Sequence, residues 1–464
     1  MNATSRDFEA YLQARQADFV AELAEFLSIP SVSAAPEHFG DVERAAAWVA
    51  ERLKKAGLEH AEVLHAGRYP MVYADWLKVP GAPTVLIYGH FDVQPADPVE
   101  AWTRPPFAPT VVGGRIYARG ASDDKGNMFA PILALEALLR TRGRLPVNVK
   151  LLFEGQEEIL SPDLPVFVAE HRERLACDMA FSADGWQWSE TEGDLRMGLR
   201  GICALEITVH GPKADLHSGV HGGAVANPIH ALAALMAGLR DADGRVAVPD
   251  FYREVRALSE EERRLIAAVP FDEAKYRVQV GVEELAGETG FTPRERIGAR
   301  PTLEINGISG GYVGAGVKTV LPSTASAKIT CRLVPDQDPA VIAARVRDHL
   351  VKQAPRGVRV EVEILPNAGH PYLIPMDHPA NRAARDVLVE LYGREPYYTR
   401  SGGSIPILDL FRRELGVYTV VFGFGLPDEN FHGPDEFLRL SSFRLGQLAY
   451  GLLIDRIAEI SASA

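Results

Sequence analysis

The segment TVLIYGHFDVQP, residues 84–95, joins a fully apolar run to a histidine and an aspartate through a glycine. A short apolar run bounded by glycine predicts a buried strand over residues 84–89. His90 and Asp92 are two positions apart, so in extended chain their side chains point to the same side. In open α/β sheets, ligands bind outside the carboxyl ends of the strands, which is where this pair falls. Taken alone, however, a structural His–Asp pair is the commoner explanation of such spacing.

The sequence on both sides of this segment predicts alternating strands and helices. Asp41 is expected to cap the first of these helices, and Gly57 is expected to end it. Apolar strands that alternate with helices predict an α/β domain with a mixed, mostly parallel sheet covered by helices. The expected strands cover residues 84–89, 147–155, 178–184 and 416–425, and the expected helices cover residues 41–57, 128–140, 379–392 and 441–460.

From about residue 195 the pattern changes to half-exposed strands, in which apolar and polar residues alternate. The charged stretch 241–300 gives no clear element. The order strand, helix, strand, helix, strand predicts a separate α+β domain inserted into the first. Its expected strands cover residues 203–211, 323–335 and 358–365, and its expected helices cover residues 227–240 and 338–352.

Length and composition exclude several classes of protein. A chain of 464 residues predicts two or three domains. The net charge of −13 argues against nucleic-acid binding, which needs a basic surface. No apolar stretch reaches the length of a membrane span, and the polar N-terminus does not read as a signal peptide. The three cysteines, Cys177, Cys203 and Cys331, form no CxxC pair, so we expect a reducing, cytoplasmic location.

Four further segments place carboxylates or a histidine near predicted strand ends or in polar loops. Asp123 and Asp124 precede a helix; one could cap it, but two adjacent carboxylates repel each other unless a cation lies between them. Glu157 and Glu158 follow a strand, where a solvated loop is the plain alternative. Asp184 closes a strand before a glycine, and this could be a simple turn.

The last of the four segments is ENFHGPDE, which contains His432 in a polar loop; a lone loop histidine usually has no special role. Each signal is weak by itself. Together they supply two histidines and several carboxylates to one predicted domain. This mixture of imidazole and carboxylate ligands suits zinc, manganese or cobalt rather than a thiolate site.

These segments occur in the order used by the di-metal aminoacylase and carboxypeptidase clan, which the sequence therefore resembles. Three longer blocks resemble its carnosinase and cytosolic non-specific dipeptidase branch, and the similarity runs through nearly the whole chain. These blocks are DLHSGVHGG (Asp215–Gly223), INGISGGYVGAGVKTVLPSTASAKITCRLVPDQDP (Ile305–Pro339) and RSGGSIPI (Arg400–Ile407).

The resemblance implies a fold, a domain division and an activity. Residues 1–195 and 375–464 would form a catalytic domain of zinc-exopeptidase type, and residues 196–374 a ferredoxin-like lid and dimerisation domain. The protein would be a homodimeric dipeptidase with two divalent metal ions per subunit, zinc first, manganese or cobalt as alternatives. It would hydrolyse the amide bond of short peptides with a free C-terminal carboxylate. The implied metal ligands are His90, Asp123, Glu158, Asp184 and His432, with Asp123 bridging the two ions.

The resemblance also implies catalytic and substrate-binding roles. Glu157 would be the general base for a water that bridges the metals, and Asp92 would orient His90. His217, supplied by the partner subunit, would stabilise the oxyanion. The substrate carboxylate would be held by Arg332 together with Gly403 and Ser404.

The family also carries a cis peptide after its bridging aspartate, so we expect one between Asp123 and Asp124. The chain departs from its relatives in one place. Where they carry a histidine in an HGGKPW-like segment, this sequence reads NAGHPY, with Asn367 in place of that histidine and His370 shifted along. The departure leaves side-chain specificity open.

Two other functions remain open besides the dipeptidase hypothesis. A deacylase of N-acyl amino acids would use the same site with a different acyl pocket. A non-catalytic binding protein on the same scaffold would have no need of Glu157 and Asp92, so their presence argues against it.

Overall fold

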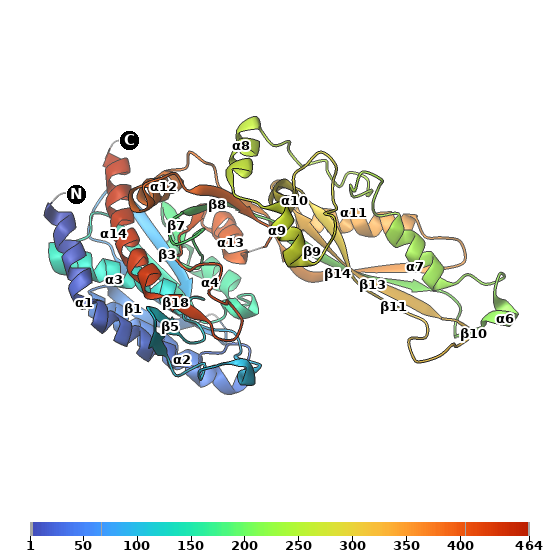
Figure 1. The fold of residues 1–464 in the computed structure, drawn as a ribbon, viewed down its shortest axis with the longest axis horizontal. Helices are drawn as coiled ribbons and strands as arrows, with labels where there is room; N and C mark the ends of the chain where they lie inside the picture. The colour runs from blue at the N-terminus through green and yellow to red at the C-terminus, as the bar shows by residue number, and fades with distance from the viewer. Residues whose placement is uncertain (1–2, 66, 404, 463–464) are drawn as a thin grey trace. The chain divides into compact units, whose positions relative to one another are not determined.

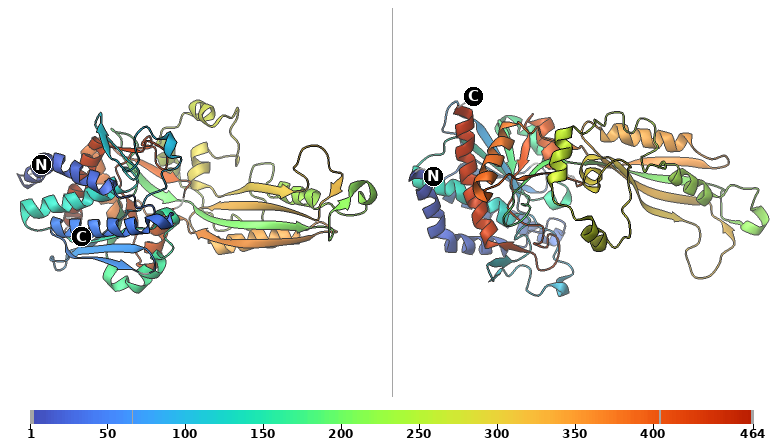
Figure 2. Two further views of the ribbon diagram at one scale, coloured as in Figure 1. Left: turned by 90° about the horizontal axis from the view of Figure 1, so that it is seen from below. Right: turned by 45° about the horizontal axis from the view of Figure 1, so that its top comes forward.

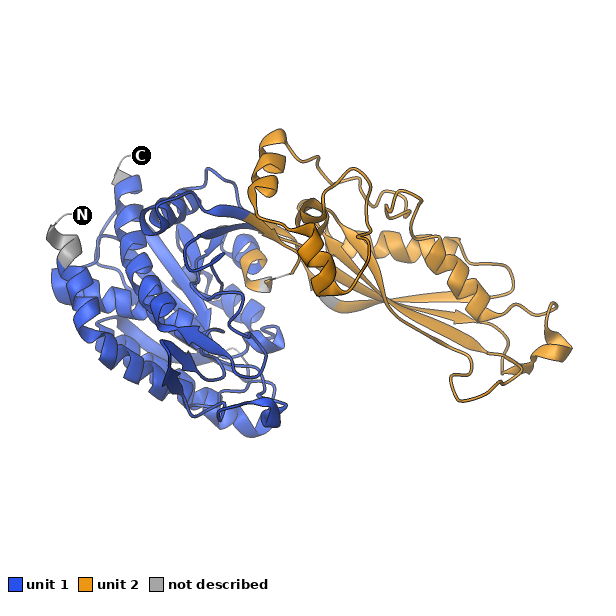
Figure 3. Ribbon diagram, viewed as in Figure 1, with its two compact units in different colours: residues 1–197, 374–398, 410–464 blue, residues 198–373, 399–409 orange. Residues whose placement is uncertain are grey.

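The computed structural model describes residues 3–65, 67–403 and 405–462, and it divides into two compact units (Figure 3). Unit 1 comprises Met1–Met197, Ile374–Tyr398 and Leu410–Ala464, and unit 2 comprises Gly198–Leu373 and Thr399–Asp409. The expected division placed residues 399–409 with the first domain. They group with unit 2 because Arg400 pairs with Glu262 and Gly402 accepts a hydrogen bond from Arg200.

Unit 1 is built on a six-stranded sheet in the order β1-β2-β6-β3-β7-β17 (Figure 1). The four strands β6, β3, β7 and β17 run parallel, whereas β2 pairs antiparallel with both β6 and β1. The expected mixed, mostly parallel sheet is confirmed. Its strands are β1 (Glu59–His65), β2 (Pro70–Trp76), β3 (Thr84–His90), β6 (Asn148–Glu154), β7 (Met179–Ser182) and β17 (Thr419–Val421).

Helices cover both faces of this sheet. Gly89 of β3 approaches Met128 of α3, whereas its neighbour Tyr88 packs edge-to-face against Phe411 of α13. Figures 1 and 2 show the C-terminal helix α14 beside α1 and α3. The helices of this part of the chain are α1 (Ala3–Leu27), α2 (Phe39–Ala56), α3 (Lys125–Arg142), α4 (Leu164–Glu170), α5 (Arg172–Leu175), α12 (Pro379–Tyr392), α13 (Pro406–Glu414) and α14 (Leu440–Ala462).

Two small sheets accompany the large one. The first has the order β18-β5-β4 and lies within unit 1. The second has the order β15-β8-β16, and the chain passes between the units within β8 and β16. Their strands are β4 (Thr110–Val112), β5 (Arg115–Tyr117), β8 (Asp194–Leu199), β15 (Tyr372–Leu373), β16 (Tyr397–Ser401) and β18 (Phe437–Arg439).

Unit 2 contains an antiparallel four-stranded sheet in the order β11-β13-β9-β14. Along the chain the elements follow as β9, α7, β11, β13, α11, β14, which is the ferredoxin-like arrangement. Alternate residues of β9 from Cys203 to Val209 share one buried core with α7 and α11, so both helices cover the same face. These elements are β9 (Gly201–His210), α7 (Pro228–Ala237), β11 (Thr302–Gly310), β13 (Thr324–Leu333), α11 (Pro339–Lys352) and β14 (Arg359–Gly369).

The remaining elements of unit 2 are short. The stretch 241–300, for which the sequence predicted no element, contains three helices that begin at side-chain caps or capping boxes. The short elements are β10 (Leu216–His217), α6 (Ser218–His221), α8 (Glu260–Ala268), α9 (Glu273–Val280), α10 (Pro293–Ala299) and β12 (Val320–Leu321).

Two details of the expected elements were wrong. Asp41 is not a cap, because α2 begins two residues earlier, and the Asp41 side chain instead binds His38 and Arg44. The strand expected over 416–425 is only Thr419–Val421, because Gly423 then packs directly against the backbone of Gly185. Among the described residues, no helix is both long and apolar enough to cross a membrane.

Candidate metal and catalytic site

The ends of three parallel strands bring the predicted site residues together. His90 is the last residue of β3, and Asp184 follows β7 by two residues. Glu157 and Glu158 lie in the short 3-10 helix η3 (Glu157–Ile159), just beyond β6. Since parallel neighbours end at the same edge of a sheet, these side chains meet there.

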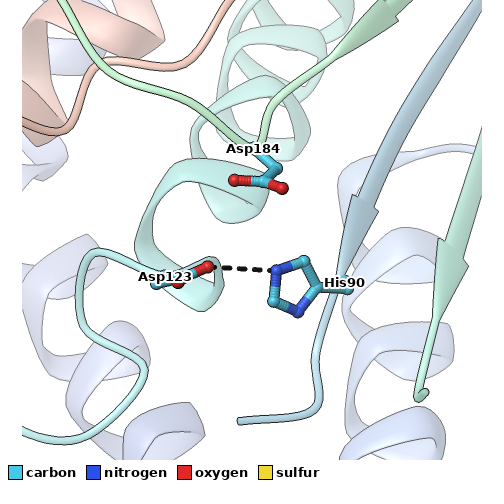
Figure 4. Close-up of side chains that lie close together, drawn as sticks. All are labelled: His90, Asp123 and Asp184. Carbon is cyan, nitrogen blue, oxygen red and sulfur yellow. Dashed lines mark hydrogen bonds and ion pairs between the residues drawn. The ribbon is translucent and has the colours of Figure 1, made fainter. Parts of the chain in front are cut away.

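Asp123 and His432 reach this edge from loops. The residues form two groups whose possible ligand atoms all lie within 4.8 Å of one another, namely His90, Asp123 and Asp184, and Asp123, Glu158 and His432. Figure 4 shows the first group, with the Asp184 carboxylate beside the His90–Asp123 pair. The two groups therefore share Asp123.

Asp123 presents a different oxygen to each histidine. Its Oδ1 lies 3.1 Å from Nε2 of His90, and its Oδ2 lies 3.0 Å from Nε2 of His432. Nε2 of His432 is also 3.2 Å from Oε2 of Glu158. This is the arrangement a carboxylate needs to bridge two cations.

Asp92 is fully buried and connects the histidine to the glutamates. Its Oδ1 lies 3.4 Å from Nδ1 of His90, whose ring also contacts the Asp92 carbonyl at 3.1 Å. The backbone N–H groups of Glu157 and Glu158 each donate to Asp92 at 3.1 Å. A carboxylate on Nδ1 leaves Nε2 as the ligand atom, so Asp92 is suited to orient His90.

Asp124 does not cap helix α3 with its side chain, although it stands at the N-cap position. Its Oδ2 accepts instead the backbone N–H of His90 at 3.1 Å. A Cβ on Gly89 would lie 2.7 Å from that same oxygen, so the close approach requires glycine. The peptide bond between Asp123 and Asp124 is cis, as expected.

The crowding of carboxylates governs the pKa values of the site. Burial raises the pKa of Asp184 to about 6, and Asp123 adds to the rise. Burial likewise raises the pKa of Glu157 well above its usual range. Hydrogen bonds to Asp123 and Glu158 raise the pKa of His432 to about 10. Burial opposes ionisation of Asp123, but its bonds with His432 and His90 outweigh that effect and lower its pKa.

These residues fit a pair of divalent cations. Two imidazoles and three carboxylates are a ligand set for zinc, manganese or cobalt, and each group of three leaves coordination positions open. The three carboxylates of this set are partly buried within one small volume, so a positive charge between them would relieve their repulsion. Glu157 lies beside the two groups without belonging to either.

Three supporting residues were not predicted. Oε1 and Oε2 of the buried Glu436 accept four hydrogen bonds, from the Arg119 guanidinium and from the N–H groups of Gly120, Ser122 and Asp123. Ser33 donates to Asp92 at 2.6 Å, and Gln94 donates to Glu158 at 2.7 Å. Gln94 and Glu436 had only proximity as a signal in the sequence, since Gln94 lies in GHFDVQP and Glu436 follows His432 by four residues, and Ser33 had none.

The other predicted residues belong to unit 2. Arg332 is in β13 and lines a pocket, and Gly403 is exposed. His217 is exposed at the end of β10, and its Nδ1 accepts the Gly219 N–H at 3.0 Å. Ser404 and the side chain of Asn367 lie outside the described residues, whereas His370 is half-buried after β14.

The α/β sheet with a carboxylate and histidine site at its strand ends defines the class of di-metal hydrolases. Residues 86–456 match the model of peptidase family M20/M25/M40. The chain therefore belongs to this family and is a metallopeptidase.

Similar proteins extend over the whole chain. It is 30% identical to the Cys-Gly metallodipeptidase dug1 of Schizosaccharomyces pombe, over 96% of both chains. It is 31% identical to the Beta-Ala-His dipeptidase of Homo sapiens, over 92% of this chain and 87% of that protein. The crystal structure of an M20 family metallo-carboxypeptidase from Sulfolobus solfataricus is also similar, with 32% identity and a TM-score of 0.81. That match covers 95% of this chain and 99% of the other.

Proposed function

We propose that the protein hydrolyses the amide bond of dipeptides and similar short peptides that have a free C-terminal carboxylate. The observation that carries this proposal is the sharing of Asp123 between two metal-ligand groups, with the partly buried Glu157 directly before the ligand Glu158 in the chain. The relatives named as dipeptidases, and the metallo-carboxypeptidase structure, support the substrate class.

Two divalent cations are the proposed cofactors, with zinc preferred and manganese or cobalt as alternatives. One would be held by His90 and Asp184, the other by Glu158 and His432, and Asp123 would bridge them. When bound, such a pair supplies Lewis-acid polarisation of the scissile carbonyl and lowers the pKa of water.

Glu157 is the proposed general base, which accepts the proton of the attacking water and delivers it to the leaving amine. The backbone N–H of Glu157 donates a hydrogen bond to the Asp92 carboxylate, and the backbone N–H of the neighbouring proposed ligand Glu158 does the same. One buried carboxylate thereby positions both glutamates as well as His90. The two adjacent glutamates can therefore serve different roles from a single rigid turn.

His217 is the proposed oxyanion donor. Because its Nδ1 accepts the Gly219 N–H, the neutral ring carries its proton on Nε2, which is then a hydrogen-bond donor. In other hydrolases, a hydrogen-bond donor of this kind stabilises the transition state by about 3–4 kcal/mol. Following the resemblance, the partner subunit supplies this residue, and Arg332 with the turn at Gly403 and Ser404 holds the substrate carboxylate.

The proposed homodimer would use the edge of the sheet in unit 2. Strand β11 stands at one end of that sheet, and its Ile308 is 65% exposed. Val313 and Val317, in the loop that follows, are each 93% exposed. Exposed apolar side chains along a sheet edge mark a surface that favours pairing with another chain.

We also propose a cytoplasmic location. Cys203 and Cys331 are direct cross-strand neighbours in β9 and β13, and both are free thiols. A reducing compartment keeps such a pair reduced. Fractionation of the producing cells tests the location, and activity in an oxidising compartment alone would contradict it.

A matched panel of substrates tests the proposed function. The panel contains free dipeptides, the same dipeptides as C-terminal amides, and N-acetyl amino acids. We expect cleavage of the free dipeptides, much slower cleavage of the amides, and cleavage slowed about 10²–10⁴-fold in a Glu157→Gln variant. Cleavage of the N-acetyl amino acids alone would make the protein a deacylase, and cleavage of nothing by the metal-loaded protein would favour the binding-protein alternative.

A further inference from the structure

Unit 2 contains a pocket of about 520 Å³ with an unusual charge balance. Its lining includes five arginines but only two glutamates. The rest of the lining includes apolar side chains, among them Val246, Ile297 and Leu303, and the polar Thr302, Asn306 and Thr330. The charged lining residues are Arg200, Arg240, Arg296, Arg300, Arg332, Glu288 and Glu304.

Both glutamates of the lining are paired with arginines of the same lining. Arg300 binds Glu288 through Nε and Nη2, each at 2.7 Å. Arg240 donates to Glu304 at 2.8 Å. The carboxylates therefore offset only part of the positive charge in the lining, and the pocket favours an anionic ligand.

Arg200 is fixed in this pocket by backbone carbonyl groups. Its Nε donates to Gly402 at 3.3 Å, and its Nη1 donates to Arg300 at 3.3 Å and to Arg296 at 3.5 Å. Carbonyl oxygens orient a guanidinium without cancelling its charge. Burial and the nearby Arg332 lower the pKa of Arg200 to about 10, which leaves it charged at neutral pH.

Arg200 also connects the two parts of the proposed carboxylate site. Arg332 lines the same pocket, and Gly402 precedes the proposed binding residue Gly403. A Cβ on Gly402 would lie 2.8 Å from Nη2 of Arg200, so the turn and the guanidinium are in close contact. Two guanidiniums thus stand where the C-terminal residue of a substrate would be held.

We propose that this pocket selects peptides whose C-terminal residue is aspartate or glutamate. Arg332 binds the main-chain carboxylate, and Arg200 binds the carboxylate of the side chain. The apolar wall contacts the methylene groups of that side chain. This specificity rests on the proposed dipeptidase function, because it concerns the far end of the same substrate.

The test compares kcat/KM for Ala-Glu with that for Ala-Gln, which has the same shape but no second charge. A charge-assisted hydrogen bond predicts a preference of about tenfold or more for Ala-Glu. In an Arg200→Gln variant this ratio falls toward one, and in Arg200→Lys it is partly kept. Arg264→Gln is the control, because Arg264 is exposed on α8 outside the lining and should leave the ratio unchanged.

The wild-type comparison alone can overturn the proposal, whether or not the variants fold. Equal kcat/KM values for the acid and the amide, or a preference for Ala-Gln, would refute the acidic specificity. If Arg200→Gln lowers kcat/KM equally for both substrates, Arg200 is a structural residue, and its proposed role in binding the side-chain carboxylate is refuted. If no dipeptide is cleaved at all, the proposed function itself fails, which is a different result.

Discussion

Asp123 turns one oxygen toward His90 and the other toward His432, and this single residue defines the geometry of the site. The sequence pointed to all five proposed ligands: His90, Glu158 and Asp184 follow apolar runs, whereas Asp123 and His432 stand in polar loops, and the resemblance supplied their roles. It could not show which oxygen faces which histidine. Nor could it show the contacts of Ser33 and Asp92, which are 59 residues apart in the chain.

Replacement of Glu157 by glutamine should separate catalysis from metal binding. Glu157 lies outside both ligand groups, so the variant should bind metal like the wild type. Loss of a general base predicts a fall in kcat of about 10²–10⁴-fold. Steady-state kinetics and metal analysis of the same samples check both expectations. A variant that retains wild-type kcat would exclude Glu157 as the base.

Glu154 predicts a pH dependence of stability. It is fully buried at the end of β6, it accepts hydrogen bonds from Tyr88 and Ser161, and burial raises its pKa from 4.5 to about 8. Between these values the unfolded chain releases the proton and the folded protein retains it. The free energy of unfolding should therefore fall as pH rises across this range.

In a Glu154→Gln variant, the free energy of unfolding should fall less as pH rises, because the amide does not titrate. Urea unfolding of both metal-free proteins at about pH 5 and about pH 8 measures the difference, which we expect to be a few kcal/mol. The same slope with pH in wild type and variant would contradict the prediction.

At the scale of elements, the apolar runs predicted β3, β6 and β7 with small errors at their ends, and the bounds of α12 were predicted without error. Helix α1 was not predicted, because the N-terminal stretch was judged by its polarity. Its buried residues Phe8, Leu12, Phe19 and Leu23 recur at helical spacing. The strands β1 and β2 were also missed, although all of β2 is buried.

The loop that carries Asp123 is held by Glu436, and this contact yields a prediction. Glu436 now accepts hydrogen bonds from three backbone N–H groups and a guanidinium. In a Glu436→Gln variant, an amide NH₂ would replace one accepting oxygen and would face these donors. We expect metal affinity to fall by about 10–100-fold, as for other outer residues that orient ligands. Competition with a chromogenic chelator measures it.

Glu100→Gln is the matched control for this variant, because Glu100 is exposed in the 3-10 helix Val99–Ala101. It should bind metal like the wild type. If the folded Glu436→Gln protein binds metal as tightly as this control, Glu436 has no role in positioning Asp123.

At the scale of the whole molecule, the ferredoxin-like unit is formed by two segments, Gly198–Leu373 and Thr399–Asp409, that interrupt the chain of the metal-binding unit. Alternating half-exposed strands predicted its α+β character, whereas its proposed roles came only from the resemblance of blocks such as DLHSGVHGG. No local pattern indicated that residues 399–409 return to unit 2. Their place depends on contacts such as Arg400 with Glu262, 138 residues away in sequence.

If His217 acts on the site of a partner subunit, two inactive variants should complement each other. Mixing His217→Ala with Glu157→Ala subunits would form heterodimers. In each heterodimer, one of the two active sites would have both residues intact. We expect activity to recover after subunit exchange, up to about a quarter of the wild-type value in a random mixture. Verified heterodimers without recovery would show that His217 does not act across the interface.

We propose that two metal ions at the shared Asp123 enable the protein to hydrolyse dipeptides. Titration of zinc or manganese into the metal-free protein, with metal content and dipeptide cleavage measured on the same samples, tests it most directly. We predict no cleavage without metal and maximal cleavage at two bound ions per subunit. Full activity in the metal-free protein, or two tightly bound ions without any cleavage of dipeptides, would contradict the claim.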